Sequence, residues 1–185
     1  LDHLVGVFGQ PVAENPGVVI QDAAFRALGL ERWRYLTLDV DKDKLGDAIR
    51  GLKALKMRGV NCTIPHKIAV MEYLDELSES ARLIGAVNTI VNDNGRLYGD
   101  NTDGKGFMMS LQSNSVDVRG KRAVVFGAGG AARAICVEMA LAGAVDITIV
   151  CRPRGRALGE ALVEIVQKNT QTAVRCEDWV GEHSI

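Results

Sequence analysis

The segment that most constrains the fold is a glycine-rich turn between an apolar strand and an apolar helix. Residues 122–126 are strand-like, and Gly127, Gly129 and Ala132 then form a Gly-x-Gly-x-x-Ala pattern. In such a turn the first glycine permits a tight bend, the second lets the backbone approach a pyrophosphate, and the small residue lets the helix pack on the sheet. The segment therefore predicts a dinucleotide-binding unit. The alternative is a glycine-rich turn that binds nothing, and the missing Gly-Lys-Ser/Thr disfavours a P-loop enzyme.

Strand-like and helix-like segments alternate along the chain, which predicts an α/β fold with parallel strands. Strands are expected at 4–8, 34–39, 59–64, 88–92, 96–99, 122–126, 146–151 and 172–176. Helices are expected at 18–28, 44–54, 69–77, 104–112, 130–142 and 156–168.

The polar residues 113–120 carry no apolar period, so we expect a domain boundary there. This predicts an N-terminal α/β substrate-binding and catalytic domain with a mixed sheet, residues 1–112. A partial Rossmann domain follows at 113–185, holding only the N-terminal half of that fold. A domain that ended there would leave an unpaired edge on its first strand, where another chain could pair.

The residues after the strand at 146–151 indicate which dinucleotide binds. Arg152, Arg154 and Arg156 follow the strand, and no acid stands among them. Arginines suit the 2′-phosphate of NADP, whereas a carboxylate would suit the ribose of NAD. NADP is therefore the expected cofactor, with NAD possible. A solvated basic loop is the alternative.

Composition excludes several other classes of function. The net charge of -1 gives no electrostatic reason to expect nucleic acid or an anionic membrane as partner. The four cysteines match no zinc spacing, so no metal is expected, and free thiols fit a reducing cytoplasm. No apolar run approaches a membrane span. A cytoplasmic protein with a small-molecule substrate is expected.

Polar residues crowd the ends of several predicted strands, the edge where open α/β sheets bind ligands. Oxidising an alcohol requires a group that removes a proton, and a lysine can do so when burial lowers its pKa. Lys67 and Asp103 are the candidate base and its carboxylate partner. Two ordinary surface residues are the alternative. His66 is expected to serve packing or hydrogen bonding, because a lone histidine indicates neither a zinc site nor a triad.

Four ordered motifs resemble the shikimate dehydrogenase family. They are Asn61-x-Thr63-x-Pro65-x-Lys67, Gly85-Ala86-Val87-Asn88-Thr89, Asn101-Thr102-Asp103-Gly104 and Gly127-Ala128-Gly129-Gly130-Ala131. The stretch 51–59 is most similar to the quinate/shikimate branch, and the resemblance covers essentially all 185 residues.

The resemblance implies reversible oxidation of a ring hydroxyl of shikimate, quinate or a related cyclic hydroxy acid, in aromatic amino acid biosynthesis or quinate metabolism. It implies that Lys67 and Asp103 are catalytic and that Thr63 and Asn88 contact substrate hydroxyls. It also assigns the cofactor to Gly127, Ala128, Gly129, Gly130, Ala131, Arg152 and Arg156. Pro153 departs from the hydroxyl residue usual between those arginines. The protein would be a monomer or a homodimer.

Another departure concerns the substrate carboxylate. The family's Ser-x-Ser-Pro turn is replaced by Asn15-Pro16-Gly17-Val18, so both hydroxyls are absent, and Asn15 could replace one bond. Two hydrogen bonds to a charged group contribute about 3 kcal/mol or more, which corresponds to about 100-fold in affinity. Two alternatives follow: a dehydrogenase of a polyol other than shikimate, and a non-catalytic ligand sensor. A methylene-tetrahydrofolate dehydrogenase-like enzyme would need a Tyr-x-x-x-Lys pattern, which the chain lacks.

Overall fold

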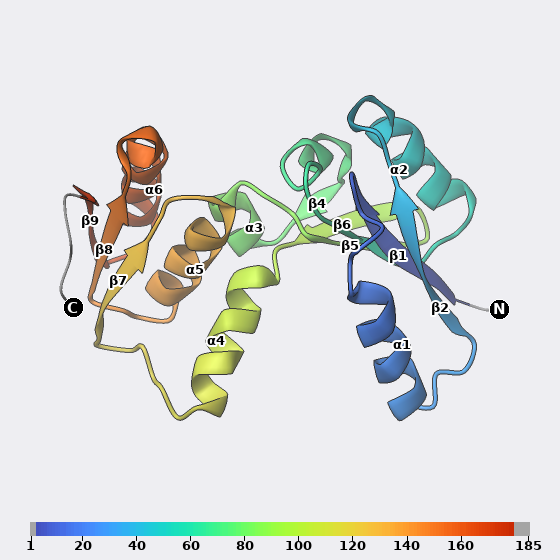
Figure 1. The fold of residues 1–185 in the computed structure, drawn as a ribbon, viewed down its shortest axis with the longest axis horizontal. Helices are drawn as coiled ribbons and strands as arrows, with labels where there is room; N and C mark the ends of the chain where they lie inside the picture. The colour runs from blue at the N-terminus through green and yellow to red at the C-terminus, as the bar shows by residue number, and fades with distance from the viewer. Residues whose placement is uncertain (1–2, 180–185) are drawn as a thin grey trace. The chain divides into compact units, whose positions relative to one another are not determined.

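The computed structural model describes residues 3–179 as two compact units, which divide between Asp100 and Asn101 (Figure 1). The boundary expected from sequence lies later, after residue 112. The difference arises because helix α4 (Asp103–Ser113) packs against a helix of the second unit. The assignment of one unit to substrate and the other to cofactor stays a prediction.

The first unit is built on a six-stranded mixed sheet in the order β2-β1-β3-β5-β6-β4. Its strands are β1 (His3–Gly9), β2 (Trp33–Asp39), β3 (Gly59–Cys62), β4 (Glu76–Leu77), β5 (Thr89–Asp93) and β6 (Arg96–Asp100). β1 runs parallel to both β2 and β3, whereas β5 is antiparallel to β3 and β6. The predicted mixed sheet is therefore confirmed.

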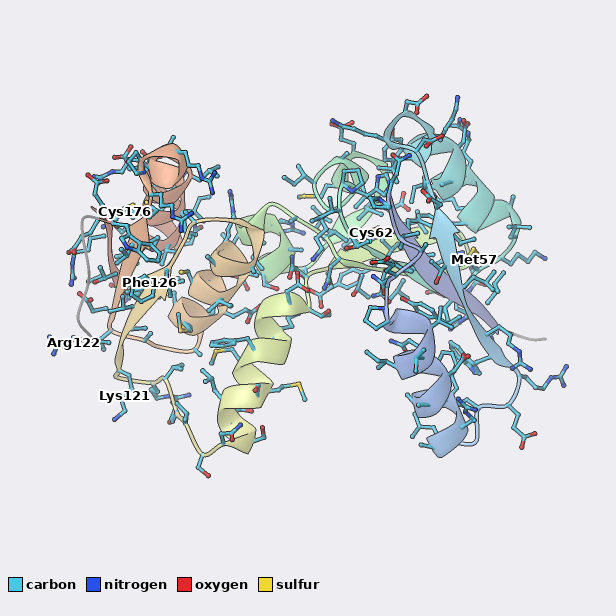
Figure 2. All side chains as sticks on the ribbon, viewed as in Figure 1. Met57, Cys62, Lys121, Arg122, Phe126 and Cys176 are labelled. Atoms are coloured by element: carbon cyan, nitrogen blue, oxygen red, sulfur yellow. The ribbon has the colours of Figure 1, made fainter. Side chains whose placement is uncertain are left out.

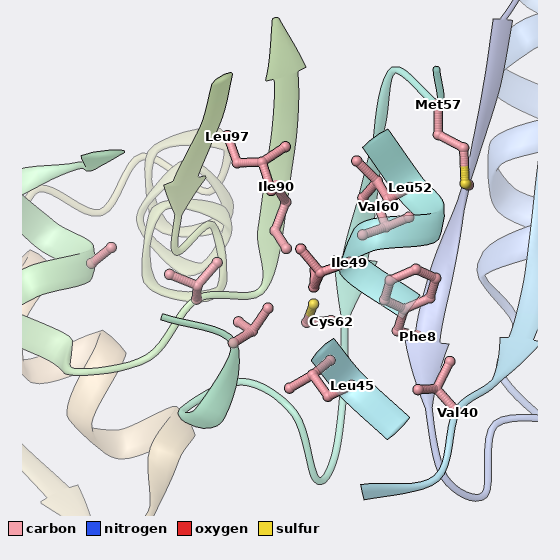
Figure 3. Packing of buried hydrophobic residues seen from close by; sticks show 13 residues of the cluster. Phe8, Val40, Leu45, Ile49, Leu52, Met57, Val60, Cys62, Ile90 and Leu97 are labelled. Carbon is pink, nitrogen blue, oxygen red and sulfur yellow. The ribbon is translucent and has the colours of Figure 1, made fainter. Parts of the chain in front are cut away.

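Helices α1 (Gly17–Ala27) and α2 (Leu45–Ala54) follow β1 and β2 along the chain. A short 3-10 turn, η1 (Lys42–Lys44), leads into α2. The buried face of α2 consists of Leu45, Ile49 and Leu52, at the spacing that one face of a helix requires. In Figure 3 these side chains belong to the same cluster as those of the sheet strands β1, β3, β5 and β6. Burying each such side chain stabilises the fold by about 1.5–3 kcal/mol.

The helix predicted at 69–77 is wrong. The structure has a 3-10 turn, η2 (Ala69–Tyr73), and then the edge strand β4. The side chain of Asp75 accepts a hydrogen bond from Leu97 N (2.7 Å), and Asp75 N donates to Leu97 O (2.9 Å). Pairing with β6 thus prevents the segment from continuing as a helix.

Sequence reasoning also missed helix α3 (Glu79–Ile84). Ser78 caps its start, because Ser78 Oγ accepts a hydrogen bond from Ala81 N at 3.0 Å. Gly85 ends it in the left-handed conformation, with φ 68°. A serine cap and a glycine stop were therefore readable signals for this helix.

The second unit contains a parallel sheet of β7 (Arg122–Phe126), β8 (Asp146–Cys151) and β9 (Ala173–Asp178), in that order. Besides α4 it has α5 (Gly130–Leu141), η3 (Pro153–Gly155) and α6 (Arg156–Asn169). α4 approaches α5 closely at Gly104, where an added Cβ would lie 2.4 Å from Ala134 O. The predicted strand–helix alternation is confirmed here. Within residues 3–179, no helix is long and apolar enough to cross a membrane.

Candidate functional site

The first group of candidate residues lies at the carboxyl ends of the parallel strands β1 and β3. Thr63 follows β3 directly, and Thr63 N donates a hydrogen bond to Phe8 O at 2.9 Å. Gln10 N donates in turn to Ile64 O at 3.0 Å. Gly9 permits this approach, because an added Cβ there would lie 2.4 Å from Thr63 Cγ2. Strand pairing therefore places Thr63 at the ligand edge that the sequence predicts.

Lys67 is held by the turn that follows. His66 N donates to Thr63 O, and the buried ring of His66 donates from Nε2 to Val40 O, each at 2.8 Å. The packing role expected for His66 is thus confirmed. Val87 N donates to Lys67 O at 2.7 Å, which joins this turn to the segment containing Asn88.

Lys67 is half-buried and has an electrostatic neighbour in the thiol of Cys62. Burial raises the pKa of Cys62 to about 12, and the positive charge of Lys67 opposes that rise. Lys67 is therefore partly shielded from solvent and lies near the buried Cys62.

A chain of hydrogen bonds fixes the orientation of Asn88. Tyr35 Oη donates to Asn61 Oδ1 (2.7 Å), and Asn61 Nδ2 donates to Thr89 Oγ1 (3.1 Å). Thr89 Oγ1 donates to Asn88 Oδ1 at 3.0 Å. Burial, and then the neighbouring Cys62, raises the pKa of Tyr35 to about 12, so its hydroxyl stays a donor at neutral pH. Sequence reasoning missed Tyr35, which nothing in the local pattern singles out.

Asn15 lies beside the start of α1 and close to Tyr35. Gly17 N donates to Asn15 Oδ1 at 2.8 Å, so the carboxamide oxygen is used within the chain. The NH2 group of Asn15 is the part that can donate to a ligand. An added Cβ at Gly17 would lie 2.7 Å from Asn15 Oδ1 and 3.3 Å from Tyr35 Oη. In place of two hydroxyls, this turn therefore has an asparagine whose carboxamide oxygen is already bonded and a glycine with little space for a side chain.

Asp103 belongs to the second unit, as the first residue of α4. Its backbone N donates to Asn101 Oδ1 at 3.1 Å, and its side chain is exposed. Lys67 belongs to the first unit. The pairing of Lys67 with Asp103 therefore stays a prediction.

The glycine loop of the second unit has the local geometry that its sequence predicts. Gly127 has φ 99°, a conformation that favours glycine, and its N donates to Val150 O at 2.8 Å. Gly129 precedes α5, Gly130 is the first residue of that helix, and Ala132 is buried. The first N–H groups of α5 have no partner within the helix, which makes its start suited to an anion.

A cavity of about 570 Å³ lies along β7, and a second one, of about 450 Å³, borders the glycine loop. The second is the candidate nucleotide site. Its lining combines Phe126, which Figure 2 labels on the second unit, with Gly127, Gly129, Arg152 and Arg154. Two guanidinium groups and the start of a helix thus border this cavity, and both can bind the phosphate groups of a phosphorylated dinucleotide.

Arg156 is engaged elsewhere. Its Nε lies 2.7 Å from Glu160 Oε1, and its Nη1 lies 2.8 Å from Asp178 Oδ1. These two partners raise the pKa of Arg156 above its usual range. Arg156 does not line the 450 Å³ cavity, whereas Arg154 does. The expected contact of Arg156 with a 2′-phosphate stays a prediction.

Trp179 also lines the 450 Å³ cavity, and sequence reasoning missed it.

Among residues 3–179, no cluster of three or more His, Cys, Asp or Glu side chains could hold a metal ion. All four cysteines are free thiols.

Comparison with known proteins places this architecture among described families. Residues 7–90 match the family model of the shikimate dehydrogenase substrate binding domain. The NADP(+) shikimate dehydrogenase of Symbiobacterium thermophilum is 50% identical over 155 residues, which are 84% of this chain and 52% of the relative. The NADP(+) shikimate dehydrogenase of Alkaliphilus oremlandii is 43% identical over 174 residues, which are 94% of this chain and 60% of that relative. The chain thus spans little more than half the length of these relatives.

Solved structures agree with the fold. The ligand-free 5-ketofructose reductase of Gluconobacter sp. strain CHM43 is 45% identical, with a TM-score of 0.94 over 99% of this chain and 65% of that protein. Shikimate 5-dehydrogenase from Listeria monocytogenes, in complex with shikimate and NAD, is 38% identical. Its TM-score is 0.92 over 95% of this chain and 61% of that protein.

Proposed function

Because the chain belongs to the shikimate dehydrogenase family, we propose that it carries substrate-binding and cofactor-binding residues of an NADP-dependent oxidoreductase. The proposed reaction interconverts shikimate and NADP+ with 3-dehydroshikimate, NADPH and a proton. The observation that carries the proposal is the cavity beside the glycine loop, lined by Arg152 and Arg154, in the same chain as the Thr63–Lys67 turn.

The residues around this cavity fit a phosphorylated dinucleotide. The loop from Gly127 to Ala131 would hold the pyrophosphate, and Arg152 with Arg154 would favour NADP over NAD. When bound, the nicotinamide supplies or accepts the hydride. Oxidised NADP and reduced NADPH share the phosphorylated adenosine end, so these contacts would serve both directions of the reaction.

Lys67 is the proposed proton donor and acceptor. In the reductive direction its ammonium group would give a proton to the carbonyl oxygen as the hydride reaches the carbon, and in oxidation its amine would take the proton back. Asp103 would orient the lysine and share a substrate hydroxyl. The support is the half-buried position of Lys67 near Cys62, together with the family motif around each residue.

Thr63 and Asn88 are the proposed contacts to the substrate's hydroxyls. The hydrogen-bond chain from Tyr35 holds the Asn88 amide in one orientation, so little entropy would be lost on binding. A cytoplasmic location and a monomer or homodimer complete the proposal. The free thiols support the location.

A second candidate function is reduction of a neutral keto sugar. The Asn15–Gly17 turn lacks the two hydroxyls that would hold a carboxylate, and Asn15 Oδ1 is already bonded to Gly17 N. The relative named a 5-ketofructose reductase is 45% identical over nearly the whole chain. A polyhydroxy ketone without a carboxylate would leave no charged group unpaired at this turn.

NADPH consumption at 340 nm distinguishes these candidates. The purified protein would be assayed with 3-dehydroshikimate and 5-ketofructose, and in reverse with shikimate and quinate. Turnover of the cyclic acids supports the first proposal, and turnover of the neutral ketose alone supports the second. Lys67→Ala should abolish turnover, whereas Lys42→Ala, an exposed lysine in η1, should retain it. Full activity of Lys67→Ala would refute the mechanism, and NADPH binding without any turnover would favour a ligand sensor.

A further inference from the structure

Trp179 stands on the wall of the nucleotide cavity, directly after β9. Its backbone N donates to Cys151 O at 2.9 Å, so the pairing of β8 with β9 extends to this residue. The position is therefore fixed by the sheet. Its side chain is 41% exposed and lines the same cavity as the glycine loop.

Two neighbours hold the indole ring. The ring centroid of Phe126 lies 5.3 Å away at an interplanar angle of 59°. Arg152 Cζ lies 5.4 Å from the indole centroid, within the range of a cation–π contact. Phe126 ends β7 and Arg152 follows β8, so residues from three strand ends meet around Trp179. Simple packing of Trp179 on Phe126 would not account for the guanidinium over the ring.

We propose that Trp179 is a positioning residue, which holds the Arg152 guanidinium over its ring so that Arg152 can bind the 2′-phosphate of NADP. The proposal rests on the nucleotide site of the proposed function. An arginine side chain has many rotamers, and a planar guanidinium stacked on an aromatic face loses fewer of them when it binds. Preorganisation of this kind raises affinity without adding a contact to the ligand.

The charges around the ring are consistent with this role. Asp178 precedes Trp179 at the end of β9, where its carboxylate would repel a phosphate. Arg156 Nη1 pairs with Asp178 at 2.8 Å, and Arg156 Nε pairs with Glu160. Arg156 thereby neutralises the acid, while Arg152, stacked on Trp179, lines the cavity. Arg156 thus offsets a nearby negative charge, and Arg152 supplies the positive charge that faces the anion.

The affinity for NADP relative to NAD is the quantity that tests the proposal. Calorimetric titration of the full chain with each oxidised cofactor gives both dissociation constants. Trp179→Ala should weaken NADP binding by about 3- to 10-fold and change NAD binding by less than about 2-fold. Trp179→Phe should restore most of the difference. A ratio of affinities within one variant does not depend on how much of that protein is folded.

The second tryptophan provides a matched control. The chain contains Trp33 and Trp179, and Trp33 lies on β2 of the first unit. Trp33→Phe should leave both affinities unchanged, and in that variant all tryptophan fluorescence comes from Trp179. NADP should then quench the emission more strongly than NAD at equal saturation.

The outcomes distinguish a failure of the positioning role of Trp179 from a failure of the proposed nucleotide site. Equal loss of NADP and NAD affinity in Trp179→Ala, or no loss of either, would overturn the positioning role and leave the proposed function standing. If the unaltered chain bound neither cofactor, the proposed nucleotide site and this inference would both be wrong.

Discussion

Replacing Asn15 and Gly17 together by serine is expected to convert the turn at the start of α1 into a carboxylate-binding one. Gly17→Ser alone would place a Cβ 2.7 Å from Asn15 Oδ1, so the asparagine would have to move. Asn15→Ser removes that oxygen. The remaining close neighbours are Tyr35 Oη at 3.3 Å and Tyr35 Cε1 at 3.4 Å, which are tight contacts but not overlaps. The double variant should therefore fold, with two hydroxyls in place.

The expected gain follows from those two hydroxyls. A hydrogen bond to a charged group contributes about 1.5–3 kcal/mol. The lower end applies here, because this turn is partly exposed and water competes for the carboxylate. Two bonds then give about 3 kcal/mol, or about 100-fold in affinity.

Calorimetric titration with shikimate measures this gain, and the methyl ester of shikimate is the matched control. The double variant should bind shikimate about 100-fold more tightly than the unaltered chain, with little change for the ester. Gly17→Ser alone should gain less, because of the clash with Asn15. An equal gain for acid and ester would refute the argument, as would tight shikimate binding by the unaltered chain.

Two further perturbations test the structure. On α4, Gly104→Ala should lower the free energy of unfolding by about 1–3 kcal/mol, because the new Cβ would meet Ala134 O. Gly106→Ala, which meets nothing within 4 Å, should raise it by about 0.5–1 kcal/mol, and urea unfolding compares the two. Burial raises the pKa of Cys136 from 9.0 to about 12, so above pH 9 the unfolded chain loses this proton first. Stability should fall as pH rises from 9 to 12, and less steeply in Cys136→Ala; an unchanged slope would contradict this.

Much of the fold was predictable because its signals are local. The alternation of strands and helices follows from the spacing of apolar residues along the chain. The φ of 99° at Gly127 follows from a turn that only glycine adopts readily. The segment 69–84 shows where such reasoning fails. Its apolar spacing suits a helix, but the hydrogen bonds of Asp75 to Leu97 turn it into an edge strand. That bond joins residues 22 positions apart, so no local pattern contains it.

The site was predictable only as far as its motifs were contiguous. Thr63 and Lys67 share one turn and could be named together, but Tyr35 reaches Asn61 across 26 positions and could not.

The basic run after β8 is an intermediate case, since the sequence shows three arginines without showing which of them face the cavity. One signal was present: Glu160 stands four residues after Arg156, a helical spacing at which acid and base pair. Arg156 begins α6 and pairs with Glu160 one turn further on, whereas Arg152 and Arg154 precede the helix and line the cavity.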